Sequence, residues 1–515
     1  MTQRKTLLSL AFVSAFLAAQ TGSADRPDEI KSLWNSFQQN SVQFLKQVPP
    51  KWDQSGMPVS SGESRFPGDV TSNQEFVRIK SSYPGPRAFA NNPHHFNFLS
   101  MNTEGFEGSD GLDSIPETIK YRTLQDIEKN RLMTFKLKES PWSGDYWPTY
   151  QGVIARRYAD ARFPGSTDWK VNADYILDQI NDTNASSMDQ LSPAEKYDLI
   201  VGDERHTLTI QMINEGKRFH DSTGTVEPWM GICHGWAPAS YRVSRPGKAV
   251  KALASDGTTW INFYPSDIKG LVTALWANVD YPSRFGGRRC NKKDPQTDEN
   301  GRITDPECFD ENPGAWHIAV VNQLGVNQSS FIIDATYDYQ VWNQPVYGYE
   351  YSYFNPQTGE SASSYTQAKV ALTEFNRDKF SRYRSSGARA VVGIAMDLTY
   401  IIETSASHDQ VDTSAQDRMR TVRYMYDLEL DDNDQIIGGE WYTNSHPDFL
   451  WRPEKDTHLK SVGDWYLDRE MPGQNWDGRT VVPATWLKSI VSSSKRSQPM
   501  SKIVDTLVIL SKLGI

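Results

Sequence analysis

A chain of 515 residues with 12% aromatic residues, including 16 Trp, is long enough for two or three domains and at least one large buried core. Its formal net charge is −10, and no basic stripe interrupts the acidic sequence, which argues against nucleic acid or an anionic membrane surface as a partner. The composition is typical of a packed globular protein and excludes a disordered chain.

The first residues have the order of a secretory signal. Arg4 and Lys5 precede an apolar run from Leu7 to Ala19 that is too short to cross a bilayer, and small residues follow it up to Ala24. We expect cleavage after Ala24, with an uncleaved membrane anchor as the alternative. Because the removed segment carries two basic and no acidic residues, the mature chain has a formal charge of −12. We expect a secreted, extracellular protein (periplasmic in a bacterium) without a membrane span.

Three further regions follow the signal peptide of residues 1–24. Residues 25–138 alternate short apolar stretches with Pro, Gly, Ser and Asn clusters and end in a helical pattern from about 115 to 138, which indicates an N-terminal domain of little chemical content. Residues 139–410 carry nearly all the distinctive motifs and are expected to be the catalytic core. Residues 411–515 are expected to form a β-hairpin, from strands at 421–430 and 435–442, and then helices.

Two helices of the core have clear start signals. Ser192-Pro193-Ala194-Glu195 is a capping box with Pro at the first helical position, and Gly202 is expected to end the helix that it opens. A second helix is expected to begin at Ser266.

Three cysteines are an odd number for an exported chain. Cys290 and Cys308 lie in one loop and are close enough to form a disulfide. This pairing leaves Cys233 as a free thiol in an apolar, aromatic stretch, which suggests a reactive role. A buried, inert cysteine is the alternative.

A predicted hairpin supplies partners for that thiol. Residues 315–321 and 331–335 have strand composition, and Leu324 to Asn327 supplies a turn. The midpoint between His317 and Asp334 falls at the centre of this turn, so the two side chains are expected to be cross-strand partners with Cβ atoms ~5 Å apart. A carboxylate there holds an imidazole in one tautomer. The alternative is a His–Asp pair that only supports a sheet.

The surroundings of Cys233 favour the catalytic interpretation. Gly231 permits a tight turn before it, and residues 236–241 can begin a helix, so that the helix dipole and an imidazolium both favour the thiolate. The order Cys, His, Asp suits a thiol acyltransferase with a papain-like plan. His234 is expected to be structural, because neighbouring helical residues point about 100° apart. A zinc site of Cys233, His234 and His220 matches no standard spacing.

Several segments resemble the transglutaminase elicitors of oomycetes and their marine Vibrio relatives. The resemblance covers residues from about 140 to 455. One of the segments, Val341 to Gly348, resembles the surface segment that plants recognise in the oomycete members. The segments are Pro-Trp-Ser-Gly-Asp-Tyr-Trp-Pro (141–148), Gly-Ile-Cys-His-Gly-Trp-Ala-Pro-Ala-Ser (231–240), Val-Trp-Asn-Gln-Pro-Val-Tyr-Gly (341–348), Ile-Ile-Gly-Gly-Glu-Trp (436–441) and Ser-His-Pro-Asp-Phe-Leu-Trp (445–451).

The resemblance implies a calcium-dependent protein-glutamine γ-glutamyltransferase, an α+β protein with a papain-like catalytic core. Its substrates are expected to be proteins that offer Gln and Lys. The resemblance carries over Cys233 as the nucleophile, and the predicted hairpin adds His317 and Asp334 to complete the expected triad. The backbone N–H of Cys233 is one expected oxyanion donor, and an indole N–H is the second. The candidate indoles are those of Trp142, Trp147 and Trp229.

Residues 296–307 follow part of the pattern of a calcium loop. The candidate ligands are Asp298, Asn300 and Glu307, although Gln296 stands where the first carboxylate ligand belongs. A solvated acidic loop is the alternative.

Two rivals to an acyltransferase stay open from the sequence. A secreted papain-like cysteine protease uses the same thioester but passes it to water. A non-enzymatic surface or recognition protein has an inert Cys233.

Overall fold

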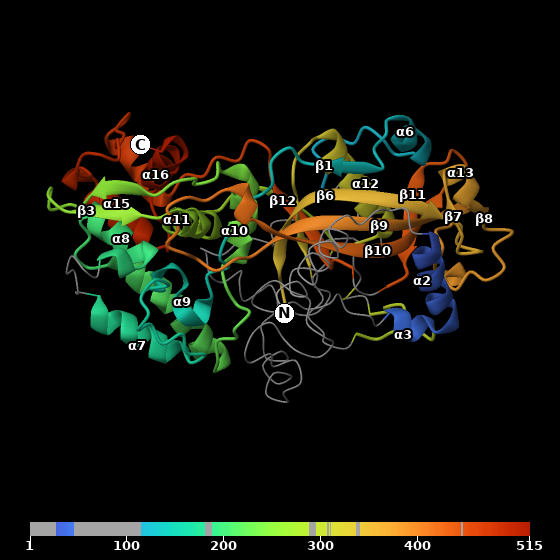
Figure 1. Ribbon diagram of the computed structural model, residues 1–515, viewed down its shortest axis with the longest axis horizontal. Coiled ribbons are helices and arrows are strands. Elements are labelled where there is room, and N and C mark those ends of the chain that lie inside the picture. Colours follow the sequence, from blue (N-terminus) through green and yellow to red (C-terminus); the bar gives the residue numbers. More distant parts are fainter. Residues whose placement is uncertain are drawn as a thin grey trace, which may run out of the picture.

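The computed structural model describes residues 27–45, 115–180, 188–287, 295–305, 308, 311–335, 340–443 and 446–514. The predicted signal peptide lies outside these residues. The described chain is a mixed α/β structure with a helical half and a half built on a curled antiparallel sheet (Figure 1). Helix α10 (Cys233–Arg242) lies where the two halves meet. Among the described helices, none is long and apolar enough to span a bilayer.

The described strands of the main sheet number ten, and all pair antiparallel. The central order is β11-β10-β9-β6-β5-β12-β4, with β1 and β7 also paired to β6 and β8 to β9. Their bounds are β1 (Thr134–Lys136), β4 (Ser283–Gly287), β5 (Ile332–Asp334), β6 (Asn343–Phe354), β7 (Ser361–Ala362), β8 (Val370–Ala371), β9 (Ala390–Ile402), β10 (Arg418–Leu430), β11 (Ile436–Trp441) and β12 (Phe449–Pro453).

The hairpin predicted at 421–442 is confirmed as β10 and β11, joined by a turn in which Asp431 accepts backbone hydrogen bonds from Asn433 and Gln435. β10 also pairs with β9 over the full length of both strands. Because β1 pairs with β6 and β10 pairs with β9, one hydrogen-bonded sheet contains strands from both sides of each predicted domain boundary, near 138 and near 410.

The helices gather mainly in the other half of the molecule (Figure 1). A small sheet of β2 (Val250–Leu253) and β3 (Trp260–Phe263) accompanies them. The remaining helices are α2 (Pro27–Gln39), α3 (Ser41–Leu45), α6 (Leu124–Lys129), α7 (Trp169–Gln179), α8 (Pro193–Val201), α9 (Thr207–Thr223), α11 (Pro265–Asn278), α12 (Pro313–Ala319), α13 (Tyr365–Ala368), α14 (Val462–Glu470), α15 (Leu487–Ser494) and α16 (Ser501–Leu513).

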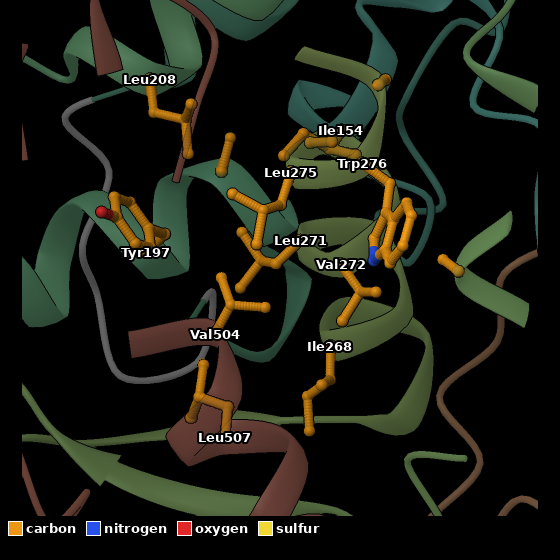
Figure 2. Packing of buried hydrophobic residues seen from close by; sticks show 14 of the residues in the cluster. Ile154, Tyr197, Leu208, Ile268, Leu271, Val272, Leu275, Trp276, Val504 and Leu507 are labelled. Carbon is orange, nitrogen blue, oxygen red and sulfur yellow. The ribbon is translucent and has the colours of Figure 1, made fainter. Parts of the chain in front are cut away.

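Helix α11 is the centre of the helical core. Its side chains are buried on every face, as expected of a helix surrounded by other elements. Val504 and Leu507 of α16 and Tyr197 of α8 pack with its leucines, as Figure 2 shows. The capping box of α8 is confirmed, and Gly202 ends that helix with a positive φ of 73°, a conformation that favours glycine. The predicted helix at Ser266 is also confirmed, because α11 begins one residue earlier.

The predicted strand at 315–321 is wrong, because this segment is helical. Pro313 occupies the first position of α12, and the Asn312 side chain caps the helix by accepting from the Gly314 N–H. A π-helical stretch continues from Val320 to Val326. This helix is buried on all sides, so its sequence lacks the alternation of apolar and polar faces that marks a surface helix. A run of apolar, β-branched residues then looks like a strand in the sequence. The helix predicted from 115 to 138 is likewise reduced to α6, with β1 after it.

The N-terminal helices cover the end of the sheet far from α10 (Figure 1). Trp34 and Phe37 of α2 pack against Tyr442, with ring centroids 5.1 and 4.9 Å away. These helices are therefore no part of the surroundings of Cys233.

Candidate active site

The loop that leads to Cys233 is fixed by backbone pairing with residues 146–149. The Ile232 N–H donates to the Tyr146 carbonyl at 2.8 Å, and the Thr149 N–H donates to the Met230 carbonyl at 2.9 Å. Gly231 lies between these bonds, where a Cβ would come within 2.5 Å of the Tyr146 carbonyl oxygen. Only glycine fits this close approach of the two backbones before the thiol.

Helix α10 is seated closely on α11. A Cβ on Gly235 would lie 2.2 Å from the Thr273 carbonyl oxygen, so the two helix backbones meet at this glycine. On another side the Trp236 indole donates to the Trp142 carbonyl at 3.1 Å. Cys233, as the first residue of α10, has a backbone N–H without an acceptor in the helix, which leaves that N–H available to an oxyanion.

Cys233 is a free cysteine, and only 5% of its surface is exposed. Its Sγ lies 3.8 Å from the Val341 carbonyl oxygen and accepts a hydrogen bond from the Asn343 side-chain amide at 3.4 Å. Burial raises the pKa of the thiol to about 11, against the hydrogen bonds from Asn343, and the negative charges of Glu403 and Asp334 add to the rise. Burial therefore disfavours the thiolate in this conformation. Stabilisation of the thiolate by the helix N-terminus stays a prediction.

Asp334 lies beside this contact. It ends β5 and pairs directly with Asn343 of β6, so the two side chains share one face of the sheet with Cβ atoms ~5 Å apart. Asp334 is fully buried, and its Oδ1 accepts from the Trp342 N–H at 2.9 Å.

His317 is not brought to Cys233. Its Nδ1 is bonded to the Tyr426 hydroxyl at 2.8 Å, and its ring stands edge-on to Tyr351 with centroids 4.8 Å apart. Tyr351 lies eight residues along β6 from Asn343, a separation of about 26 Å at the usual rise of a strand. Burial lowers the pKa of His317 to about 3, which keeps the imidazole neutral.

The predicted cross-strand pair of His317 and Asp334 is consequently wrong. The pairing required a strand at 317, whereas His317 lies on α12 and only Asp334 lies on a strand. Of the expected triad, the structure places Cys233 and Asp334 near one another and His317 over the middle of the sheet.

The three candidate tryptophans have other contacts. The indole N–H of Trp142 donates to the Val243 carbonyl at 3.2 Å, and that of Trp229 donates to the Glu227 carboxylate. The Trp147 ring packs against Gly270 and edge-on to Tyr158. An oxyanion role for any of them stays a prediction.

Two of the predicted calcium ligands, Asp298 and Asn300, make other contacts in this structure, and the calcium loop stays a prediction. Asp298 accepts from the backbone N–H groups of Asn300 and Arg302 and from the guanidinium of Arg382 and the hydroxyl of Tyr383. Its carboxylate therefore stabilises a turn and an ion pair, and the Asn300 amide donates to the Lys379 carbonyl. Glu307 lies outside the described residues. No group of three or more His, Cys, Asp or Glu side chains suited to a metal occurs among the residues that are described.

The predicted disulfide stays a prediction. Cys308 is buried, but Cys290 lies outside the described residues.

Sequence reasoning missed Asn343 and Trp451. The Trp451 indole donates to Asn343 Oδ1 at 2.7 Å, and all three residues of the chain Trp451–Asn343–Cys233 are buried. Both residues fall within segments that resemble the family, and this resemblance was the signal that could have identified them. Neither residue carries a charge, so neither resembles a catalytic acid or base. The segment from Val341 to Gly348, which resembles a surface segment of the oomycete members, is buried from Trp342 onward, and β6 begins within it at Asn343.

Comparison with known proteins agrees with these motifs. Residues 119–469, more than half of the chain, match the family described as transglutaminase elicitor. A crystal structure of the GP42 transglutaminase from Phytophthora sojae matches at 22% identity with a TM-score of 0.45, over 73% of this chain and 94% of that chain. No curated protein matches significantly. From the match over residues 119–469, the chain belongs to the transglutaminase elicitor family.

Proposed function

We propose that this protein is a secreted protein-glutamine γ-glutamyltransferase with Cys233 as its nucleophile. The observation that carries the proposal is the placement of a free thiol on the first residue of α10, against β6 and beside Asp334, in a member of the transglutaminase elicitor family. A thiol at a helix N-terminus that faces an antiparallel sheet is the arrangement of a papain-like site. Acyl transfer through a thioester needs such a thiol as its nucleophile.

The reaction has two steps. The Cys233 thiol loses its proton, and the thiolate attacks the side-chain carboxamide of a protein-bound Gln. The C–N bond breaks as the thioester forms, and the leaving NH₂ group takes up one proton, equivalent to that lost by the thiol, and departs as ammonia. A Lys amine then attacks the thioester carbonyl, forms the amide and returns the thiol. The backbone N–H of Cys233, which has no acceptor within α10, is available to the carbonyl oxygen on which negative charge develops.

The buried, neutral thiol sets a condition on the first step. Sγ must be exposed and ionised when the substrate arrives, since the thiolate and not the thiol is the nucleophile. The role of His317 in the expected triad is replaced by a structural one. Sγ has hydrogen-bond contacts to Val341 and Asn343, so the described residues give it no imidazole partner.

Amine incorporation tests the proposal. The wild type is expected to attach a labelled primary amine to Gln residues of an acceptor protein and to release ammonia, whereas Cys233→Ser is expected to do neither while it retains the same thermal unfolding. The assay is run with a reductant, and with calcium or a chelator, since the calcium requirement implied by the family stays a prediction. Near wild-type incorporation by Cys233→Ser refutes the assignment.

The same preparation decides between the rivals. Cleavage of casein without amine incorporation identifies a cysteine protease. A wild-type Cys233 that iodoacetamide does not modify at mildly alkaline pH, with neither activity present, identifies an inert cysteine in a recognition protein.

A further inference from the structure

We propose that Asn343 is the hydrogen-bond donor that stabilises the Cys233 thiolate and that Trp451 is a positioning residue that fixes the orientation of the Asn343 amide. The inference uses the proposed function only for the nucleophilic role of Cys233.

The contacts leave one orientation of the amide. An indole N–H can only donate, so the Asn343 atom that it contacts at 2.7 Å must be the carbonyl oxygen. The amide nitrogen then points to Sγ at 3.4 Å, where it presents a hydrogen atom. The usual ambiguity between oxygen and nitrogen of an Asn side chain is thereby removed by a neighbour that has no acceptor.

The strands hold this arrangement in place. Trp451 of β12 pairs with Ile332 of β5, and Ile332 pairs with Pro345 of β6. Asn343 lies two residues from Pro345 and therefore on the same face, because side chains alternate along a strand. Trp451, Ile332 and Cys233 also share one buried cluster, whereas Ile333 and Leu450, one residue along, belong to the cluster on the other face. The indole therefore reaches Asn343 across β5, on the face that α10 covers.

A neutral donor is what this environment requires. Glu403 and Asp334 both disfavour a negative sulfur, and the hydrogen bonds from Asn343 oppose them. An acceptor at position 343, or an amide turned to present its oxygen, would add to the repulsion. Trp451 prevents that turn because its own N–H would then face an NH₂ group inside the core.

The test is the rate of Cys233 alkylation by iodoacetamide as a function of pH, measured on the folded full-length chain. Asn343→Leu keeps the branched shape of the side chain and removes the donor, so its alkylation profile is expected to move to higher pH, with a rate about 10-fold lower at a fixed pH below the thiol pKa. Asn343→Asp also adds a charge and is expected to be slower still. Trp451→Phe is expected to give a smaller shift in the same direction. Trp486→Phe serves as the control, since it is also a fully buried tryptophan but makes no hydrogen bond among the described residues.

A double-variant cycle separates positioning from general destabilisation. If Trp451 acts through Asn343, Trp451→Phe is expected to add nothing to the alkylation shift of Asn343→Leu, whereas independent effects add. An Asn343→Leu profile within twofold of wild type at every pH overturns the proposal, and so does full additivity. Alkylation needs no glutamine substrate, so a shifted profile together with absent amine incorporation refutes the proposed function and leaves this inference standing.

Discussion

Replacing His317 by Phe separates a catalytic histidine from a structural one. Phe keeps the edge-on ring contact with Tyr351 but removes the His317 partner of the buried Tyr426 hydroxyl, whose other contacts are the Met396 sulfur at 3.8 Å and the Trp316 side chain. Loss of a buried hydrogen-bond partner costs about 1–3 kcal/mol of unfolding free energy. We therefore expect a folded variant with measurably lower resistance to urea.

The effect on Cys233 is expected to be small. At the ~26 Å set by eight residues of β6, a full charge on His317 would interact with the thiolate by about 0.6 kcal/mol at an effective dielectric constant of 20. This energy corresponds to less than half a pKa unit, or about a threefold change in the thiolate fraction. A histidine in direct contact with the sulfur would instead change reactivity by orders of magnitude.

The assay pairs urea unfolding with iodoacetamide alkylation and amine incorporation, each under conditions where the variant is folded. A fall of 100-fold or more in alkylation or turnover, with the fold retained, would refute the placement of His317 and restore the expected triad. A change within about threefold, together with a loss of stability, agrees with the structure.

Three further outcomes follow from particular contacts. Gly235→Ala places a methyl group against the Thr273 carbonyl and is expected to lower stability by about 1–3 kcal/mol or more in urea unfolding, whereas Gly387→Ala, whose nearest contact is Ile437 at 3.4 Å, is expected to have a far smaller effect. Burial lowers the pKa values of His317 and His446 to about 3, so below their ordinary pKa near 6.5 the unfolded chain binds protons that the folded chain does not. The free energy of unfolding is therefore expected to fall as the pH drops below about 6.5, by up to about 1.4 kcal/mol per pH unit for each histidine. Urea unfolding at several pH values measures this fall, and His317→Phe should remove the contribution of one histidine. Asp298→Asn is expected to leave any calcium dependence of amine incorporation unchanged, measured by calcium titration against a chelator, because Arg382 and the turn amides already use that carboxylate; a lost or weakened calcium response would show that the loop does bind the ion.

Local signals in the sequence predicted what local physics decides. The capping box at Ser192, the helix start near Ser266 and the β10–β11 hairpin each depend on a few neighbouring residues, and each is found where expected. The placement of Cys233 at a helix N-terminus belongs to this class too, because a helix start is a short-range pattern.

The prediction of the catalytic partner failed at a position where the local pattern is ambiguous. Ala315 to Val321 is buried on all sides, so apolar, β-branched residues fit a helix and a strand equally well. Asn312-Pro313 is a helix start signal, and it outweighs that composition. The cross-strand register of His317 and Asp334 assumed a hairpin, and once the first strand is lost, every side-chain position that depends on it is lost as well.

The arrangement around Cys233 depends on strand order, which no local pattern encodes. Asp334 and Asn343 become neighbours because β5 and β6 pair, and Trp451 joins them from 108 residues further along because β12 takes the other edge of β5. None of the three is a typical partner for a thiol when its sequence segment is considered alone. The three side chains belong to one site because they share the face of the sheet that lies opposite the first turn of α10. Their effect on the thiol therefore depends on how the strands pair, and variants that change one side chain on one strand at a time test it.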